Sequence, residues 1–267
     1  MPAMDIVVCL KQIPNPDLQF QIAPDGKDVK REGLTWKTNS SDEFALEEAV
    51  RLKEKHKGKV TALTAGPPRT VQMLREAMAK GADEAVRIAY DDPAAVDPMQ
   101  VGSMLAAALA KTPHDLVLTG VQSDDYLYSE TPGWIAGKLR VPHASVVTKV
   151  EVAGREAKVW RELEGGVHEV CSLPLPALLT IQFGINVPRY APLPAIMRAA
   201  KAPIKELQAK DLGVAGWDAF ASGYSLGVKG LSPPQALGRA RMITGKTEEV
   251  AKALATMLRE KGFYRGA

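Results

Sequence analysis

The chain has 267 residues, 46% of them hydrophobic and 24% charged, and a formal net charge of +3 at pH 7. This composition suits one large domain, or one domain plus an arm, and excludes wholesale disorder. The charge is too small and too evenly spread for a nucleic-acid-binding protein, and no apolar run reaches the roughly 20 residues of a membrane helix. Two distant cysteines, Cys9 and Cys171, exclude a disulfide scaffold, so we expect a reducing, cytoplasmic compartment.

Strands and helices alternate through the first half of the chain. Apolar runs predict strands at 4–10, 60–64, 86–89 and 115–119. Amphipathic stretches predict helices from about 41, at 70–80, from 97 to about 111 and from 131 to about 139. The first helix start is set by Ser40 and Glu43, which have the spacing of a capping box. Asp97-Pro98 with Gln100 predicts another capped start, with proline at the first helical position. Such alternation predicts a parallel sheet covered on both faces.

The pattern changes after residue 143. Runs rich in β-formers at 145–152, 158–163, 167–173 and 177–183, with turn signals between the first three, predict an antiparallel extension. Residues 184–235 look loop-rich, and 248–260 have the pattern of a final amphipathic helix. The predicted fold is α/β, a doubly wound, mostly parallel sheet of the Rossmann-like, adenine-nucleotide-binding kind, with an antiparallel extension and a C-terminal arm.

The usual enzyme motifs are missing from the sequence. No two glycines are spaced as Gly-x-Gly, so the dinucleotide fingerprint of NAD dehydrogenases is absent. There is no Gly-x-Ser-x-Gly elbow and no His-Glu-x-x-His motif, and the four histidines are scattered. We therefore expect no catalytic residue and no metal site in this chain.

One long polar loop follows the strand at 115–119. In an open parallel sheet, ligands bind outside the carboxyl ends of the strands, which here are Cys9, Ala65 and Gly120. The loop that starts at Gly120 ends at Thr131, at a helix N-terminus, where free backbone N–H groups and the helix dipole favour a phosphate. Small residues at Ala65 and Gly66 would let an adenine or ribose approach the backbone. A solvated loop with Thr131 as a simple helix cap fits the pattern equally well.

A proline-rich stretch, residues 186–194, follows the last predicted strand. Its prolines lower the entropy cost of holding an extended loop. Leu193 stands between Pro192 and Pro194, and an exposed leucine there would make an apolar docking anchor. The pattern by itself favours a stiff connector whose leucine packs inward.

Taken together, several segments resemble the β subunit of electron transfer flavoprotein. They lie in the family's order between residues 4 and about 262, without large gaps. The matching segments are Val7–Gln12, Asn39 with Glu43–Glu54, Thr64–Pro67, Ala79–Asp83, Arg161–Gly166, Asn186–Met197 and Asp211–Val214.

The resemblance implies an electron carrier rather than an enzyme, in a heterodimer whose α subunit holds the redox FAD while this subunit holds an AMP. The chemistry would belong to the flavin. Electrons would pass from an acyl-CoA dehydrogenase or similar flavoenzyme to a membrane quinone oxidoreductase. The chain would divide into a nucleotide-binding domain (1–185), a partner-recognition loop (186–203) and a C-terminal arm that embraces the α subunit (204–267).

The site residues implied by the resemblance fall into three sets. Glu162 would help to steer the flavin domain. The surface that docks on the dehydrogenase, with Leu193 as its anchor, would comprise Tyr190, Pro192, Leu193, Ile196 and Met197. The nucleotide contacts would be Cys9, Asn39, Ser40, Ser41, Asp42, Ala65, Gly66, Gly120, Val121, Gln122, Ser123, Asp124, Ser129, Glu130 and Thr131.

Two other functions stay open. In the electron-bifurcating branch of the family, the same site holds a second FAD that NADH reduces, but the Gly-Asp-Thr run of that branch is missing here. A stand-alone adenine-nucleotide-binding enzyme, such as an ATP pyrophosphatase, needs a Ser-Gly-Gly-x-Asp-Ser loop after the first strand. This chain has Lys11-Gln12-Ile13-Pro14 there instead.

Overall fold

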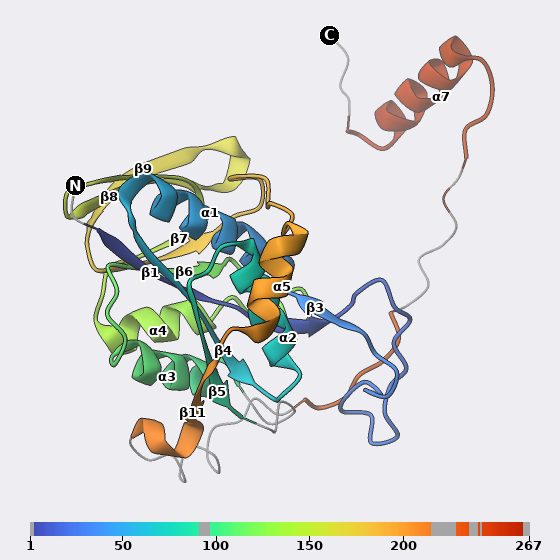
Figure 1. Ribbon diagram of the computed structural model, residues 1–267. Coiled ribbons are helices and arrows are strands. Elements are labelled where there is room, and N and C mark those ends of the chain that lie inside the picture. The colour runs from blue at the N-terminus through green and yellow to red at the C-terminus, as the bar shows by residue number, and fades with distance from the viewer. Residues whose placement is uncertain (1–2, 91–96, 215–227, 235–239, 241, 264–267) are drawn as a thin grey trace. The chain divides into compact units, whose positions relative to one another are not determined.

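A nine-stranded sheet forms the centre of the first of two units, residues 1–230 (Figure 1). The computed structural model describes residues 3–90, 97–214, 228–234, 240 and 242–263. In spatial order the strands are β11 (Lys205–Gln208), β5 (Glu84–Ala89), β4 (Gly58–Gly66), β1 (Met4–Cys9), β6 (Leu116–Gly120), β10 (Ala177–Ile181), β7 (His143–Ala153), β8 (Glu156–Glu162) and β9 (His168–Pro174).

Most of this sheet is parallel. Every neighbouring pair from β11 to β7 is parallel, and β7–β8 and β8–β9 are antiparallel. A separate antiparallel pair joins β2 (Gln12–Pro14) to β3 (Trp36–Thr38), which the sequence did not predict. The predicted α/β fold, with a mostly parallel sheet and an antiparallel extension, is confirmed. The run at 177–183 is the exception, because β10 lies between β6 and β7 and pairs parallel with both.

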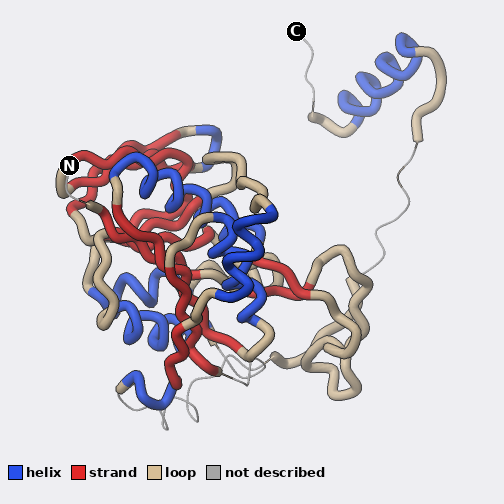
Figure 2. The backbone as a smooth tube through the Cα atoms, in the orientation of Figure 1, coloured by secondary structure: helices blue, strands red, loops and turns tan. Residues whose placement is uncertain are grey.

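Helices cover both faces of the sheet (Figure 2). Strand β1 shows the division, since successive side chains of a strand point to opposite faces. Ile6 and Val8 belong to the core under α1 (Ser40–His56) and α2 (Thr70–Lys80). Val7 and Cys9 belong to the core under α3 (Pro98–Leu109) and α4 (Thr131–Leu139). Burial on both faces explains why this strand is a continuous apolar run.

The start of α1 differs from the predicted capping box. Asn39 is the N-cap residue of α1, and it makes no side-chain capping hydrogen bond. The Ser40 hydroxyl donates to Asp124 Oδ2 over 2.6 Å, and Glu43 pairs with Lys80 at 3.3 Å. The capping box was wrong because both side chains have partners far away in the sequence. The cap predicted for α3 is confirmed, with the N–H of Gln100 donating to its N-cap Asp97.

Residues 184–235 contain more regular structure than the sequence indicated. Helix α5 (Leu193–Lys201), strand β11 and a 3₁₀ turn at Ala209–Leu212 all lie in this stretch, whose residues 215–227 and 235 fall outside the described part. Pro194 occupies the first turn of α5, where a helix needs no N–H donor, so this proline begins a helix instead of extending a loop. The expected extended conformation ends at Pro192.

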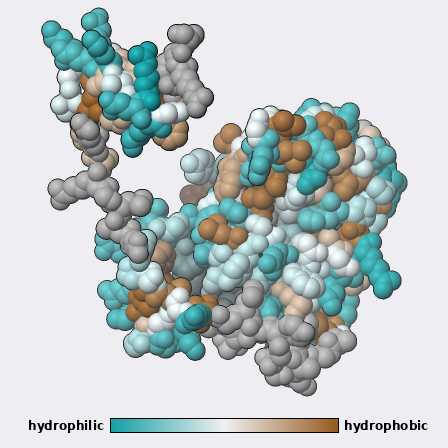
Figure 3. Space-filling model, turned by 180° about the vertical axis from the view of Figure 1, so that it is seen from behind, coloured by the Kyte–Doolittle hydropathy of each residue, from teal (hydrophilic) through white to brown (hydrophobic). Residues whose placement is uncertain are grey.

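The second unit, residues 231–267, contains α7 (Thr247–Glu260), which confirms the predicted final helix. Within the described ranges, none of the helices is long and apolar enough to span a membrane. Hydrophobic and hydrophilic groups lie side by side on the face shown in Figure 3. Such mixing is normal for a protein surface, so an exposed apolar group carries meaning only where several gather.

Gly102 sets how closely α3 and α4 approach, and we predict that Gly102→Ala is destabilising. A Cβ on Gly102 would lie 2.6 Å from the Cβ of Trp134 and 3.2 Å from the carbonyl oxygen of Thr131. Pushing the helices apart should lower the free energy of unfolding by about 1–3 kcal/mol, measured in urea by circular dichroism. Gly137→Ala is the matched control, because a Cβ there would have no atom within 4 Å apart from its chain neighbours and the backbone of its own helix. Equal stability of the two variants would contradict the close contact.

Candidate functional site

A cavity lies at the carboxyl ends of β1, β4 and β6. Cys9, Ala65 and Gly120 stand at these three strand ends, and all three line the cavity. The first turns of α3 and α4 face it from the other side, with Pro98 and Thr131 among the lining residues. The structure therefore brings together the strand ends and the helix N-terminus that the sequence singled out.

Most of the predicted nucleotide contacts line this cavity. Ser40, Ser41 and Asp124 are outside the lining and belong to the polar contacts behind it. Their contact with a nucleotide, like that of the lining residues, stays a prediction. The predicted residues in the lining are Cys9, Asn39, Asp42, Ala65, Gly66, Gly120, Val121, Gln122, Ser123, Ser129, Glu130 and Thr131.

The carboxylate of Asp42 joins three segments behind the cavity. Its Oδ1 accepts the backbone N–H of Gly120 at 2.9 Å, and its Oδ2 accepts that of Lys11 at 2.7 Å. Asp42 lies in the first turn of α1 and is 5% exposed. The ends of β1 and β6 are thus held on the N-terminus of α1. Burial raises the pKa of this carboxyl to about 7, although the hydrogen bonds that it accepts act in the opposite direction.

The loop after β6 is fastened to the same helix start. The amide of Asn39 donates to the carbonyl of Gln122 at 2.8 Å and accepts the N–H of Asp124 at 2.9 Å. The Ser41 hydroxyl donates to the carbonyl of Gln122 at 2.7 Å, and Ser40 binds the Asp124 carboxylate through its N–H and its hydroxyl. Ser40, Ser41 and Asp124 therefore hold the loop in place.

The rim of the cavity carries two aromatic rings and a cation that the site prediction left out. Tyr126 and Tyr128 stack with their ring centroids 5.7 Å apart, and both line the cavity. Lys11 Nζ lies 4.7 Å from the ring centroid of Tyr126 and 2.6 Å from Asp125 Oδ1. The sequence could have marked Lys11 as a site residue, because it lies two residues past the end of β1 and ligands bind near such strand ends.

The inner wall of the cavity is apolar. Helices α3 and α4 supply Pro98, Val101, Met104, Leu105 and Ile135. The sequence did not reveal this wall, since its spacing on α3 is that of any core-facing helix. Burial raises the pKa of the Cys9 thiol far above its ordinary value, so Cys9 is neutral and extends the apolar surface.

The N-terminus of α4 provides the polar end of the cavity. A helix start presents backbone N–H groups that lack partners within the helix, together with the positive end of the helix dipole. Thr131 lines the cavity there, and the nearby Ser129 hydroxyl donates to Gln122 Oε1 over 3.3 Å. An apolar wall with an anion-attracting end suits a ligand that has a planar ring at one end and a phosphate at the other. Among the described side chains, no group of three His, Cys, Asp or Glu could hold a metal ion.

The predicted docking residues gather on α5 and on the turn before it. Tyr190 is 97% exposed, Leu193 70%, Met197 59% and Ile196 46%, and the exposed Pro192 is the N-cap of α5. The alternative in which Leu193 packs inward is wrong. As a contact surface for a partner, the group stays a prediction.

Glu162 ends β8, the middle strand of the antiparallel extension. Its side chain is exposed, and Oε2 accepts a hydrogen bond from Gln182 Nε2 at 2.9 Å. The carboxylate is therefore accessible to a partner of opposite charge. Its role in steering a flavin domain concerns another subunit and stays a prediction.

We predict that Asp42→Asn changes how stability depends on pH. The pKa of Asp42 is about 7 in the fold against 3.8 for the free group, so the fold favours the protonated carboxyl. The stabilisation from Asp42 is full below about pH 4 and is lost as the pH rises through 7. Relative to the variant, the wild-type unfolding free energy should fall by a few kcal/mol over this range, at about 1.4 kcal/mol per pKa unit.

Urea unfolding at several pH values checks this difference. Asparagine is also expected to be less stable than the protonated acid, because its NH₂ group must face the N–H of Lys11 or of Gly120. Parallel pH profiles for the two proteins would show that Asp42 does not titrate in this range.

Comparisons with known proteins agree with one another. Residues 27–212 match the family model described as the electron transfer flavoprotein domain. The chain is 37% identical to the electron transfer flavoprotein subunit beta of Methylophilus methylotrophus, over 99% of this chain and 100% of the relative. It is 35% identical to the protein of that name from Sus scrofa, over 98% and 99% of the two chains. It is 36% identical to the caffeyl-CoA reductase-Etf complex subunit CarD of Acetobacterium woodii, over 97% and 99%.

The matched residues of the family model span more than half of the chain, and the relatives match it nearly end to end. The resemblance drawn from separate segments is thereby confirmed. The chain belongs to the electron transfer flavoprotein family, as one of its β subunits, which carry electrons and are not enzymes.

Proposed function

We propose that this β subunit holds an AMP in the cavity at Cys9, Ala65 and Gly120, and shuttles electrons as half of a heterodimer. A FAD held mainly by the α subunit would supply the redox chemistry. Electrons would arrive from an acyl-CoA dehydrogenase or a similar flavoenzyme and leave to a membrane quinone oxidoreductase. The free cysteines, Cys9 and Cys171, are consistent with a protein of the reducing cytoplasm.

The observation that carries the nucleotide proposal is the pairing of an apolar wall with a helix N-terminus in one cavity. An adenine ring would lie against the wall that includes Met104 and Ile135, and the phosphate would accept from the first turn of α4. The fixed loop after β6 and the hydroxyls of Ser129 and Thr131 would add donors. The residues present fit this group, since the Asp42 carboxylate in the lining has both oxygens occupied by backbone N–H groups.

The docking proposal depends on the exposed apolar group that includes Tyr190, Leu193 and Met197. A leucine that is 70% exposed on the first turn of a helix can insert into a pocket of another protein without rearrangement of this chain. A small apolar anchor gives weak binding and rapid release, which an electron carrier with several partners requires.

The remaining assignments concern the α subunit. We assign residues 1–185 to nucleotide binding, 186–203 to partner recognition and 204–267 to an arm that embraces α. Strand β11, near the start of the arm, also pairs with β5 in the sheet. The arm includes α7, whose Leu254 and Leu258 are exposed and available for packing. Glu162 would attract a basic group of the flavin domain, which fits its exposed carboxylate.

Mass spectrometry of the nucleotides released from the co-purified heterodimer, with a flavin absorbance count, tests the cofactor. We expect one FAD and one AMP per heterodimer. Two FAD would favour the electron-bifurcating role, in which this subunit joins the redox machinery. One FAD without AMP would contradict the nucleotide proposal, and Tyr126 and Tyr128 at the rim would then be the groups to remove first.

Leu193→Ala should weaken docking while the heterodimer stays folded. Truncating a central apolar anchor commonly costs 2 kcal/mol or more, so we expect the KM for an acyl-CoA dehydrogenase to rise at least about thirtyfold. Stopped-flow reduction of the heterodimer by the substrate-reduced dehydrogenase measures it. Phe20→Ala is the control, because Phe20 is a 44% exposed apolar side chain outside the docking residues. A normal rate for Leu193→Ala would overturn the docking assignment.

A further inference from the structure

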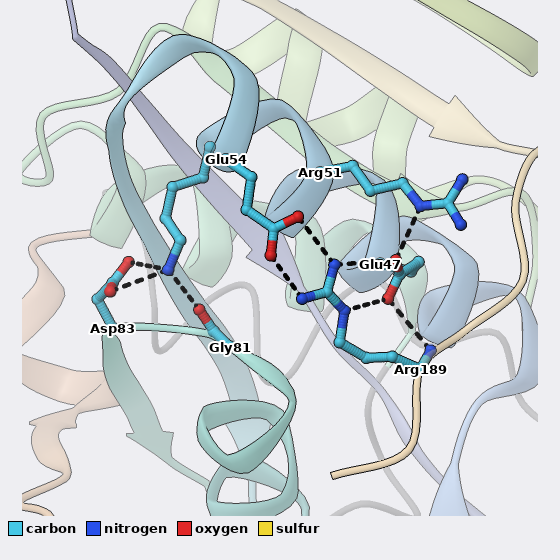
Figure 4. A network of polar contacts seen from close by, with 7 residues as sticks. Glu47, Arg51, Glu54, Gly81, Asp83 and Arg189 are labelled. Atoms are coloured by element: carbon cyan, nitrogen blue, oxygen red, sulfur yellow. Dashed lines mark hydrogen bonds and ion pairs between the residues drawn. The ribbon is translucent and has the colours of Figure 1, made fainter. Parts of the chain in front are cut away.

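A single arginine ties the exposed docking residues to α1. We call residues 186–197 the docking segment. The guanidinium of Arg189 binds two carboxylates at once (Figure 4). Nε and Nη2 donate to the two oxygens of Glu47 at 2.8 and 3.1 Å, and Nη1 and Nη2 donate to those of Glu54 at 2.6 and 3.1 Å. The backbone N–H of Arg189 also donates to Glu47 Oε2 at 3.1 Å.

The two carboxylates differ in their surroundings. The Glu47 side chain is only 4% exposed, and Arg51 pairs with it as well, at 2.8 Å. Glu54 is 54% exposed. A buried carboxylate requires a cation nearby, so Glu47 constrains where Arg189 can lie. Two fork-shaped pairs and one backbone contact fix the plane of the guanidinium and the path of the main chain at Arg189.

The ends of the docking segment and its helix are held by other polar contacts. Asn186 Nδ2 donates to the carbonyl of Phe44 and to Glu48 Oε2, both at 3.0 Å. Arg75 Nη1 of α2 donates to the carbonyl of Ala199 at 2.6 Å, near the end of α5. Between these points, from Tyr190 to Met197, the large apolar side chains face solvent. Arg189 is therefore the anchor point next to the exposed group.

We infer that Arg189 is a positioning residue for partner docking, holding Tyr190 and Leu193 in the arrangement that the dehydrogenase recognises. The inference rests on the proposed docking function. Apolar side chains that face solvent make no core contacts that would order the segment. If the segment became ordered only on binding, the lost conformational entropy would weaken docking. The contacts of Arg189 order the segment already in the free heterodimer, so this entropy is not lost again when the partner binds. Lysine cannot replace it fully, since an ammonium is a point charge without the planar fork.

The test compares Arg189→Gln, Arg189→Lys and Arg51→Gln in the intact heterodimer. Arg51→Gln is the matched control, because Arg51 is the other cation on Glu47, and no hydrogen bond or ion pair joins it to the described residues of the docking segment. The first measurement is hydrogen exchange of the backbone amides in peptides that cover residues 187–197, without any partner. We expect Arg189→Gln to speed this exchange about tenfold or more, and Arg51→Gln to leave it within about twofold of the wild type.

The second measurement is electron transfer from an acyl-CoA dehydrogenase reduced by its acyl-CoA. Arg189→Gln should raise KM about five- to tenfold and leave kcat within about twofold, because flavin chemistry is untouched. Arg189→Lys should fall between the wild type and Arg189→Gln. Thermal unfolding of each heterodimer separates these effects from loss of the fold, and the exchange of peptides outside the docking segment should not change.

The outcomes distinguish this inference from the docking function itself. If Leu193→Ala raises KM while Arg189→Gln does not, docking stands and the positioning role is wrong. If Arg51→Gln raises KM as much as Arg189→Gln, the effect is a general one of charge on α1, and the positioning role is again wrong. If neither Leu193→Ala nor Arg189→Gln changes KM, the docking function is wrong and this inference falls with it.

Discussion

A buried carboxylate, that of Asp42, is the contact on which the cavity depends. Two parallel strands, β1 and β6, can end in register side by side, but nothing in their pairing places a helix start beside them. Asp42 does so, because its two oxygens accept the backbone N–H groups of Lys11 and Gly120 while its main chain belongs to α1. The desolvation cost is visible in its raised pKa. A Cβ at position 120 would collide with Asp42 and Ser41, so this contact requires a glycine there.

Helix α1 holds both the loop beside the cavity and the docking segment. The first turn of α1 fastens the loop after β6 through Asn39 and Ser41, and its middle holds Asn186 and Arg189 through Glu47 and Glu48. An α-helix rises about 1.5 Å per residue, so the two regions lie about 10 Å apart along its axis. Polar groups buried on a helix need partners, and here those partners are loops that the helix must position. The charged run after Asn39 is thus more than a solvated helix face.

The sequence was most informative where one local pattern decides the structure. Continuous apolar runs placed β1, β4 and β6, and Asp97-Pro98 placed the start of α3. The sequence was misleading where a side chain's conformation depends on a partner that is distant in the sequence. Ser40 and Glu43 have the spacing of a capping box, yet their partners are Asp124 and Lys80, more than 30 residues away. No local rule ranks such contacts against a cap.

The candidate site shows the same division. The strand ends and the helix start at Thr131 follow from topology rules, so they could be named in advance. The apolar wall of α3 could not, because Met104 and Leu105 are spaced like any core residues and only the tertiary fold places a cavity beside them. The helical form of the docking residues was hidden for another reason. Prolines at 192 and 194 suggest a stiff loop, but a proline in the first turn also begins a helix.

The docking region inverts the usual distribution of side chains, and the proposed function explains why. Its carboxylate at Glu47 is 4% exposed while its leucine at 193 is 70% exposed. A leucine packed into this chain's own core could not reach a partner, so burial of Leu193 itself cannot order the segment that carries it, although Ala199 of the same helix is buried. Polar contacts to α1 and α2 add to this order, and the pair with Glu47 contributes more than the exposed pair with Glu54 because Glu47 is shielded from water. Burial of Glu47 therefore helps an exposed anchor to be a rigid one.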